Sequence, residues 1–304
     1  MVKLLTYVQN EFIIKAEVIK LKMEYDCLPC LFRQSLESAR MVTDDKKIIK
    51  DILKKYSKML PELIDSDAKA PMISEEMQKY IKEISGVDDP YAEIKEKNLK
   101  SAFKLLPLVK EEIKKADDPL LAALLMSAMG NSIDAGVSLN VNIKENIESA
   151  LADSFAYSDY QQFLKELQQA EELLFIADNT GEAVFDKLLI KKIKEDYNLK
   201  ITYAVRETAI LNDITAEGAK ELGIDDYAEI IKSGSRAPAM LMESASNQFL
   251  KHYQNADLVI SKGQGNLEGL YGIESEIYFL LKAKCEVIAE LLKVKKGDFV
   301  FIYR

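Results

Sequence analysis

The residues of this chain that could perform chemistry gather at the ends of short apolar runs in its second half. Asp178 and Asn179 follow one such run directly, and Arg206 follows the next one, with Asp213 shortly after it. Carboxylate and amide oxygens coordinate divalent cations, and a guanidinium binds phosphate or carboxylate groups through paired hydrogen bonds. Plainer alternatives stay open at this point. Asp178, Asn179 and Asp213 could cap the helices that follow them, and Arg206 could lie at the surface.

A further apolar run leads to Lys262, which is followed by Gly263 and Gly265. An ammonium group beside a glycine-rich turn suits phosphate binding, although the third glycine of the dinucleotide fingerprint is missing and a plain turn is the alternative. Together these strand ends suit one task, which is to hold a divalent cation with a phosphoryl group on it. We expect attack by metal-activated water, with Asp178, Lys262 and Arg206 as catalytic residues.

The supply of metal ligands restricts the kind of site. The chain has one histidine, His252, so a His-rich zinc site is impossible and hard cations such as Mg²⁺ or Mn²⁺ fit better. Three cysteines are too few for a disulfide framework, which favours a reducing, cytoplasmic setting. Cys27 and Cys30 could belong to a second metal site with Cys285 and one more ligand. Ordinary packing of two helical cysteines is the simpler interpretation.

The second half alternates strands with helices, which predicts an α/β domain with a largely parallel sheet. In such sheets ligands bind where the strands end, so the polar residues above stand in the expected place. The predicted strands cover 173–177, 201–205, 228–232, 257–261, 277–282 and 298–303, with helices near 182–197 and 215–222.

The first half shows apolar residues at three- and four-residue spacing, which predicts helix after helix. We expect breaks at Pro61, at Ala70-Pro71 and at 86–90. The predicted helices cover 28–41, 46–60, 74–84, about 91–115 and about 119–134. These patterns predict an all-helical domain over residues 23–150 and an α/β metal-binding catalytic domain over 151–304.

Bulk properties exclude some partners. A net charge of −9 argues against broad nucleic-acid binding, which needs a basic surface. No apolar run approaches the roughly 20 residues that span a bilayer, so we expect no membrane partner. The expected partner is a small phosphorylated metabolite, and the oligomeric state stays open.

Several segments resemble signature segments of the damage-control phosphatase family, the ARMT-like metal-binding family formerly known as a domain of unknown function. The segment with Cys27 and Cys30 resembles the start of its prokaryotic and archaeal branch, and the match runs from about Met23. Residues 1–22 precede the usual start, so we interpret them as an N-terminal extension, with Met23 as a candidate initiator. The matching segments are 26–31, 89–91 with Lys95 and Asn98, 130–134, 178–186, Arg206 with 212–213, 261–266 and 282–285.

This resemblance implies a helical N-terminal domain packed against a Rossmann-like three-layer α/β/α domain, with a divalent metal between them. It places the metal ligands on Asp178, Asn179 and Asp213. It implies hydrolysis of sugar phosphates or damaged phosphometabolites, with Mn²⁺, Co²⁺ or Ni²⁺ often preferred over Mg²⁺. We expect the substrate or its phosphate to contact Glu182, Arg206, Asn212, Lys262, Gly263, Gly265, Asn131 and Asp134.

The resemblance has one departure and leaves two other functions to weigh. Ala239 stands where a glycine is usual, which is tolerable only if its φ is negative. A carboxyl methyltransferase using S-adenosyl-methionine has been proposed within the family, but no glycine-rich loop clearly makes the pocket it needs. A non-catalytic protein that binds metal or a phosphometabolite is the other alternative.

Overall fold

A computed structural model describes residues 21–136, 154–273 and 276–304, including their side chains except at 131–136. The N-terminal extension predicted over 1–22 therefore lies almost wholly outside the described residues. The helices are α1 (Cys27–Val42), α2 (Lys46–Ile64), α3 (Ala70–Ser85), α4 (Ala92–Lys115), α5 (Pro119–Gly136), α7 (Tyr160–Leu167), α8 (Thr180–Asp196), α9 (Ala216–Glu221), α10 (Asn247–Asn255), α11 (Gln264–Leu270) and α12 (Glu286–Leu292). The strands are β1 (Tyr157–Ser158), β2 (Glu172–Ile176), β3 (Lys200–Val205), β4 (Glu229–Lys232), β5 (Leu258–Lys262), β6 (Tyr278–Lys282) and β7 (Phe299–Tyr303).

The strands of the described chain form one sheet in the order β1-β7-β6-β5-β2-β3-β4. All neighbours pair in parallel except β6 and β7, which are antiparallel. The sheet thus places β2 between β3 and β5, so the three strands that lead into the candidate residues are direct neighbours. β1 has two residues and was not predicted, because so short a segment shows no periodicity.

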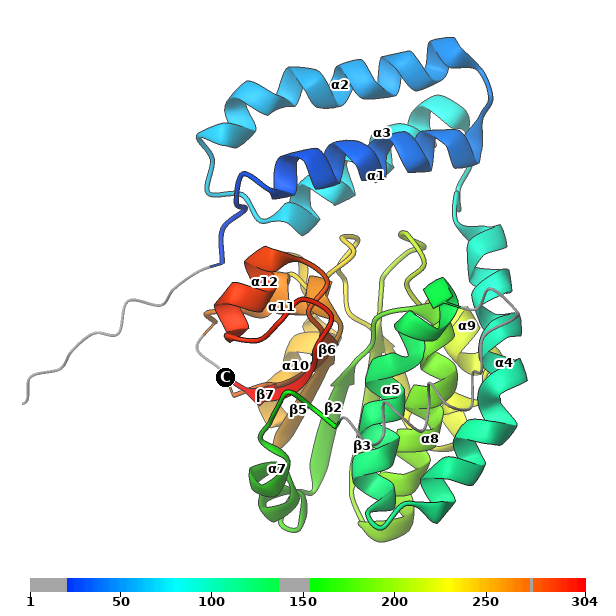
Figure 1. Ribbon diagram of the computed structural model, residues 1–304, viewed down its shortest axis with the longest axis vertical. Coiled ribbons are helices and arrows are strands. Elements are labelled where there is room, and N and C mark those ends of the chain that lie inside the picture. The colour runs from blue at the N-terminus through cyan, green and yellow to red at the C-terminus, as the bar shows by residue number, and fades with distance from the viewer. Residues whose placement is uncertain (1–20, 137–153, 274–275) are drawn as a thin grey trace, which may run out of the picture.

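Side-chain alternation along the strands builds two cores, one on each face of the sheet. Leu173 and Phe175 of β2 pack into a core shared with α4, α5 and α8. Leu174 and Ile176 pack into the other core, shared with α10, α11 and α12. The result is the predicted three-layer α/β/α arrangement with a mostly parallel sheet, which confirms the predicted fold class (Figure 1).

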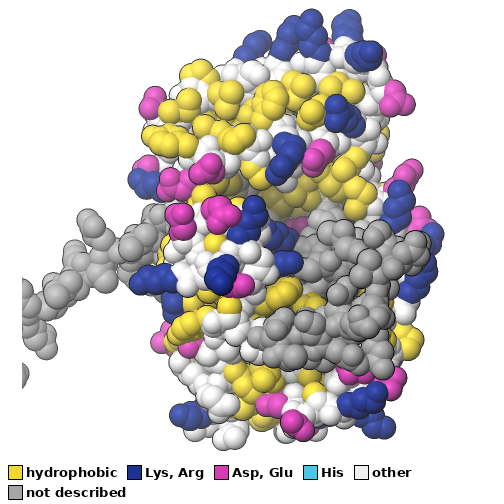
Figure 2. Space-filling model, in the orientation of Figure 1, with side chains coloured by type: hydrophobic (Ala, Val, Ile, Leu, Met, Phe, Trp, Pro, Cys, Tyr) yellow, Lys and Arg dark blue, Asp and Glu magenta, His cyan; other side chains and the backbone are white. Residues whose placement is uncertain are grey.

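Helices α1, α2 and α3, called the cap from this point, bury a separate core that includes Ile52, Tyr56 and Ile81. The cap lies across the end of the sheet where the parallel strands finish (Figure 1). Lys69 of the cap donates to the carbonyl of Gly269 at 2.5 Å. Figure 2 shows lysine and arginine side chains along the outer edge of the cap and a band of hydrophobic side chains below them. No helix in the described ranges is long and apolar enough to cross a membrane.

Helices α4 and α5 share a core with the sheet and not with the cap. The domain boundary near residue 150 therefore remains a prediction, and the packing groups α4 and α5 with the α/β layers. The break predicted at Pro61 is wrong, because α2 continues through it to Ile64. Burial of Leu63 in the cap core holds this last turn helical. α3 begins at Ala70 with Pro71 in its first turn, where no backbone N–H is needed.

Candidate active site

The site is built where β2, β3 and β5 end side by side. The register pairs Ile176 with Ala204 on one side and with Ser261 on the other. Asp178, Arg206 and Lys262 therefore leave the sheet next to one another, as the sequence pattern predicted. All three side chains are buried, with Lys262 fully inaccessible.

Asp213 is brought to this edge by the backbone of the loop that follows β3. Asn179 and Asp213 form an isolated antiparallel bridge. The amide of Ile214 donates to the carbonyl of Asp178 at 2.9 Å, and the amide of Thr180 donates to the carbonyl of Asn212 at 2.8 Å. Main-chain hydrogen bonds thus fix Asp178, Asn179 and Asp213 against each other. Asn179 stands at the N-cap position of α8, but its side chain makes no cap hydrogen bond, so the alternative of a plain helix cap does not explain it.

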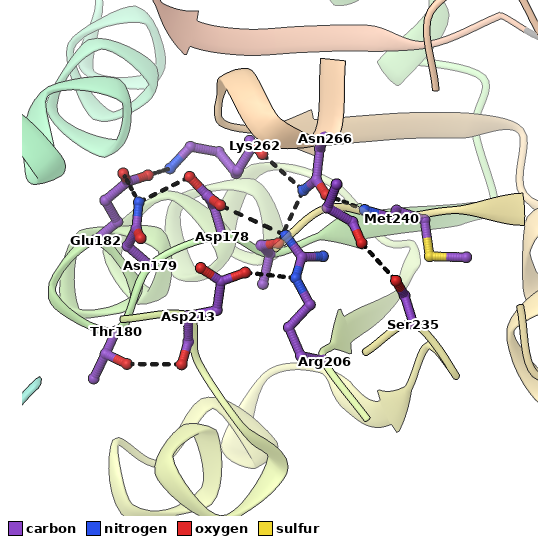
Figure 3. A network of polar contacts seen from close by, with 12 residues as sticks. Asp178, Asn179, Thr180, Glu182, Arg206, Asp213, Ser235, Met240, Lys262 and Asn266 are labelled. Atoms are coloured by element: carbon purple, nitrogen blue, oxygen red, sulfur yellow. Dashed lines mark hydrogen bonds and ion pairs between the residues drawn. The ribbon is translucent and has the colours of Figure 1, made fainter. Parts of the chain in front are cut away.

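Arg206 pairs with both aspartates. Its Nε donates to Asp213 Oδ2 at 2.6 Å, and its Nη2 lies 3.6 Å from Asp178 Oδ1 (Figure 3). Within the described residues neither Nη1 nor Nη2 has a hydrogen-bond acceptor, although both are buried. The guanidinium therefore holds the two carboxylates and still has donors to offer a ligand.

The ammonium group of Lys262 donates all its hydrogen bonds to other groups of the protein. Its Nζ donates to the carbonyl of Ser127 at 2.9 Å, to Glu182 Oε2 at 2.9 Å and to Asp186 Oδ1 at 2.7 Å. An ammonium group has three donors, so all of them are used. The phosphate role of Lys262 and Glu182 stays a prediction, and in the structure the two side chains pair with each other (Figure 3).

Gly263 and Gly265 permit close packing at the end of β5. Gly263 has φ +81° and ψ 157°, and a Cβ there would lie 2.0 Å from Asp178 Oδ2. A Cβ on Gly265 would lie 2.4 Å from the carbonyl oxygen of Pro238. Neighbouring protein atoms thus leave no space for a side chain at either glycine. Ala239, in the same loop as Pro238, does not have a positive φ, so an alanine is tolerated at this position.

Burial and repulsion dominate the electrostatics. Burial, Asp213 and Glu182 together raise the pKa of Asp178 well above its usual value of 3.8. Burial also raises the pKa of Asp213, against the lowering effect of Arg206. Burial alone would lower the pKa of Lys262, but Asp186 and Glu182 outweigh it and raise that pKa. Ionising the two aspartates in the folded protein therefore costs free energy, and a nearby cation would relieve that cost.

The charged side chains of the site, when all are ionised, carry more negative than positive charge. Every buried charged side chain in the described ranges lies in this site, and four carboxylates face two cations. These side chains are Asp178, Glu182, Asp186, Arg206, Asp213 and Lys262. The excess of two negative charges matches a divalent ion, and oxygen donors suit a hard one. No cluster of three or more His, Cys, Asp or Glu side chains in the described chain is arranged to hold a metal, so Asn179 would have to serve beside the two aspartates.

Some predicted residues fall elsewhere. Asn131 and Asp134 belong to the last turns of α5, and their side chains lie outside the described residues. Cys27 is half-buried at the start of α1 and Cys30 is exposed, and both are free thiols. Burial raises the pKa of Cys27 to about 11, with Glu268 and Cys285 among the smaller causes.

Sequence analysis missed two residues of the site. Asp186 accepts hydrogen bonds from Ser127 Oγ at 2.6 Å and from the Tyr203 hydroxyl at 2.9 Å, besides the bond from Lys262. It stands four residues after Glu182 on α8, a helical spacing that could have revealed it. Exposed Lys284, in the turn after β6, lies near enough to lower the pKa of both Asp178 and Asp213.

Comparison with known proteins identifies the family of this chain. The sequence profile of the damage-control phosphatase ARMT1-like domain matches residues 23–300. The chain is 35% identical to an uncharacterized protein of Methanocaldococcus jannaschii, over 95% of this chain and 97% of that protein. It is 34% identical to a damage-control phosphatase of Pyrococcus horikoshii, over 92% and 97% of the two chains. The crystal structure of that P. horikoshii protein, described as a DUF89 family protein, superposes with a TM-score of 0.85 at 32% identity, covering 92% of this chain and 98% of that one. This chain therefore belongs to the damage-control phosphatase ARMT1-like family.

Proposed function

We propose that the protein is a metal-dependent phosphatase that hydrolyses small phosphate monoesters, such as sugar phosphates or damaged phosphometabolites. The observation that carries the proposal is the gathering of all buried charged side chains of the described chain at the ends of three adjacent strands. Buried unpaired charge is costly, so proteins retain it chiefly where a ligand or a reaction uses it. The names of the P. horikoshii and Archaeoglobus fulgidus relatives support a phosphatase.

In this proposal Asp178, Asn179 and Asp213 hold a divalent cation such as Mn²⁺, Co²⁺, Ni²⁺ or Mg²⁺. The bound ion would supply positive charge against the phosphoryl oxygens and acidify water. Arg206 keeps both aspartates oriented through Nε and Nη2, and its terminal nitrogens donate to a phosphoryl oxygen. Exposed Lys284 adds positive charge at the mouth of the site and attracts the anionic substrate.

The cap supplies the remaining wall. It lies across the strand ends, and Lys82 of α3 donates to the carbonyl of Ala209 in the loop that carries Asp213. We infer that the cap limits the size of the substrate, because it lies across the strand ends around which these groups gather. Exclusion of water by such a cover strengthens every charge interaction beneath it.

The test is phosphate release from a panel of sugar phosphates with each metal, comparing wild type with Asp178→Asn and Asp213→Asn. Asp226→Asn is the matched control, since this aspartate is 70% exposed and pairs with Lys187 rather than with a residue of the site. We expect each site variant to lose about 100-fold or more in kcat/KM. This loss exceeds the roughly 10–100-fold loss that is usual when a residue supporting a metal ligand is replaced. Activity that survives chelation or both substitutions would refute the proposal. Consumption of S-adenosyl-methionine, or tight binding without turnover, would refute it in favour of an alternative.

A further inference from the structure

The side-chain amide of Asn179 is oriented by two carboxylates. Its Nδ2 donates to Asp178 Oδ2 at 2.8 Å and to Glu182 Oε1 at 2.9 Å. An amide nitrogen has two hydrogens, so both are used and Nδ2 has no donor left. The amide oxygen must then face away from Glu182, on the remaining side of the group (Figure 3).

This orientation matters because the two ends of an amide have nearly the same shape and opposite character. Oxygen is a ligand for a hard cation, whereas an NH₂ group presents two positive hydrogens to it. Turning the amide over would place its oxygen against carboxylate oxygens of Asp178 and Glu182 and would lose both hydrogen bonds. Glu182 therefore selects the end of Asn179 that is offered to a ligand.

Glu182 is itself held from behind. Its second oxygen, Oε2, accepts from Lys262 at 2.9 Å, while Lys262 also donates to Asp186 at 2.7 Å. Asp186 is fixed in turn by the hydroxyls of Ser127 and Tyr203. All five side chains are buried, so water does not compete for these bonds. The chain of contacts runs from the core of the α/β layers to Asn179 without a break.

We propose that Glu182 is a positioning residue, held by Lys262 and Asp186, that fixes the Asn179 amide with its oxygen toward the cation. This inference rests on the proposed metal site. It reassigns Lys262 from a phosphate ligand to a support for Glu182, because its ammonium has no donor left for phosphate. Residues behind metal ligands typically contribute 10–100-fold to metal affinity, which sets the expected size of the effect.

A double-mutant cycle tests this with Mn²⁺ alone as the probe, so that turnover is not involved. The dissociation constant is measured by titration calorimetry and by the electron paramagnetic resonance signal of free Mn²⁺. The variants are Glu182→Gln, Asn179→Ala and the two combined. Glu182→Gln leaves Lys262 paired with Asp186, so we expect it to fold, and its thermal melting is measured alongside. Glu268→Gln is the matched control. Burial raises the pKa of the Glu268 carboxylate, and this carboxylate accepts a hydrogen bond from Gln264 and not from Asn179.

We expect Glu182→Gln to weaken Mn²⁺ binding about tenfold, Asn179→Ala to weaken it at least as much, and Glu268→Gln to leave it unchanged. If Glu182 acts through Asn179, the double variant binds within about twofold of Asn179→Ala. If Glu182 acts only by its charge or by general stability, the two losses multiply, and that result overturns the proposal. Unchanged affinity in Glu182→Gln overturns it as well. Wild-type protein that binds no Mn²⁺ would refute the metal site itself, which distinguishes the two failures.

Discussion

Gly263 offers a direct test of how tightly the site is packed. Its backbone has φ +81° and ψ 157°, a conformation that is open almost only to glycine. A Cβ at this position would lie 2.0 Å from Oδ2 and 2.4 Å from Cγ of Asp178. In Gly263→Ala the carboxylate of Asp178 must therefore move away, and the movement falls on a proposed metal ligand.

The expected magnitude has two parts. The backbone strain costs about 1–3 kcal/mol of unfolding free energy, which any side chain at such a φ incurs. The contact of 2.0 Å must in addition lengthen by roughly 1.5 Å to reach an ordinary nonbonded distance of about 3.5 Å. Metal–ligand distances tolerate only about 0.2 Å, so Asp178 would leave the coordination sphere. We expect Mn²⁺ binding to weaken by about 100-fold or more, beyond what loss of a supporting residue causes.

Gly297→Ala is the matched control. Gly297 has φ +100°, and a Cβ there would meet nothing within 4 Å. Both variants should lose stability in chemical denaturation, and only Gly263→Ala should lose Mn²⁺ affinity in calorimetry. Affinity within about threefold of wild type in Gly263→Ala would refute the reasoning, since a displacement of about 1.5 Å cannot leave a ligand in place.

Three further predictions follow from the pKa shifts and the contacts of the cap. The raised pKa of Asp178 means that the metal-free folded protein binds a proton that the unfolded chain releases, so stability is lost as pH rises from about 4. Between pH 4 and 8 the melting temperature of the metal-free protein should therefore fall more for wild type than for Asp178→Asn, and equal slopes would contradict this. Burial raises the pKa of Cys27 to about 11, so only about 0.1% of this thiol is thiolate at pH 8. Iodoacetamide should therefore modify the exposed Cys30 first, as followed by mass spectrometry, and equal rates would contradict the burial of Cys27. Lys82→Met removes the hydrogen bond from the cap to Ala209 and should cost about 1 kcal/mol of unfolding free energy in urea denaturation, whereas unchanged stability would show that the bond contributes nothing.

The strand ends could be predicted from sequence because two simple rules apply to them. An apolar run of five residues identifies a buried strand, and parallel strands finish at one edge of the sheet. Together these rules place Asp178, Arg206 and Lys262 at one edge of the sheet. The partner of Asp213 could not be foreseen, because the bridge to Asn179 depends on the path of the loop after β3.

The partners of Lys262 were missed because they come from helices. Leu258 and Ile260 of β5 face the core that includes α5 and α8, so alternation places Lys262 on that same face. There it meets the carbonyl of Ser127 and the carboxylate of Asp186. The composition of the turn suggested a phosphate cradle. It gave no sign of these internal partners, because they lie on segments far from β5 in the sequence.

The helical half illustrates the opposite difficulty. Local patterns found the helices themselves, but they do not show against which surface each helix packs. The apolar face of α4 resembles those of the cap helices in sequence, yet Leu105 and Val109 enter the core of the sheet. Long-range packing decides this, and helical periodicity alone carries no information about it.

If the proposed metal site binds its cation, the excess of two buried negative charges also connects the protein's abundance to the supply of metal ions. A chain that folds without a cation must desolvate carboxylates that lack a full set of partners, and an ion bound only by the folded state offsets that cost by mass action. At a cation concentration 100 times its dissociation constant, the gain is about 2.7 kcal/mol. Since a change of about 1–2 kcal/mol can alter steady-state levels several-fold through proteolysis of unfolded chains, a cell short of the metal would hold less of the protein itself as well as less of its activity.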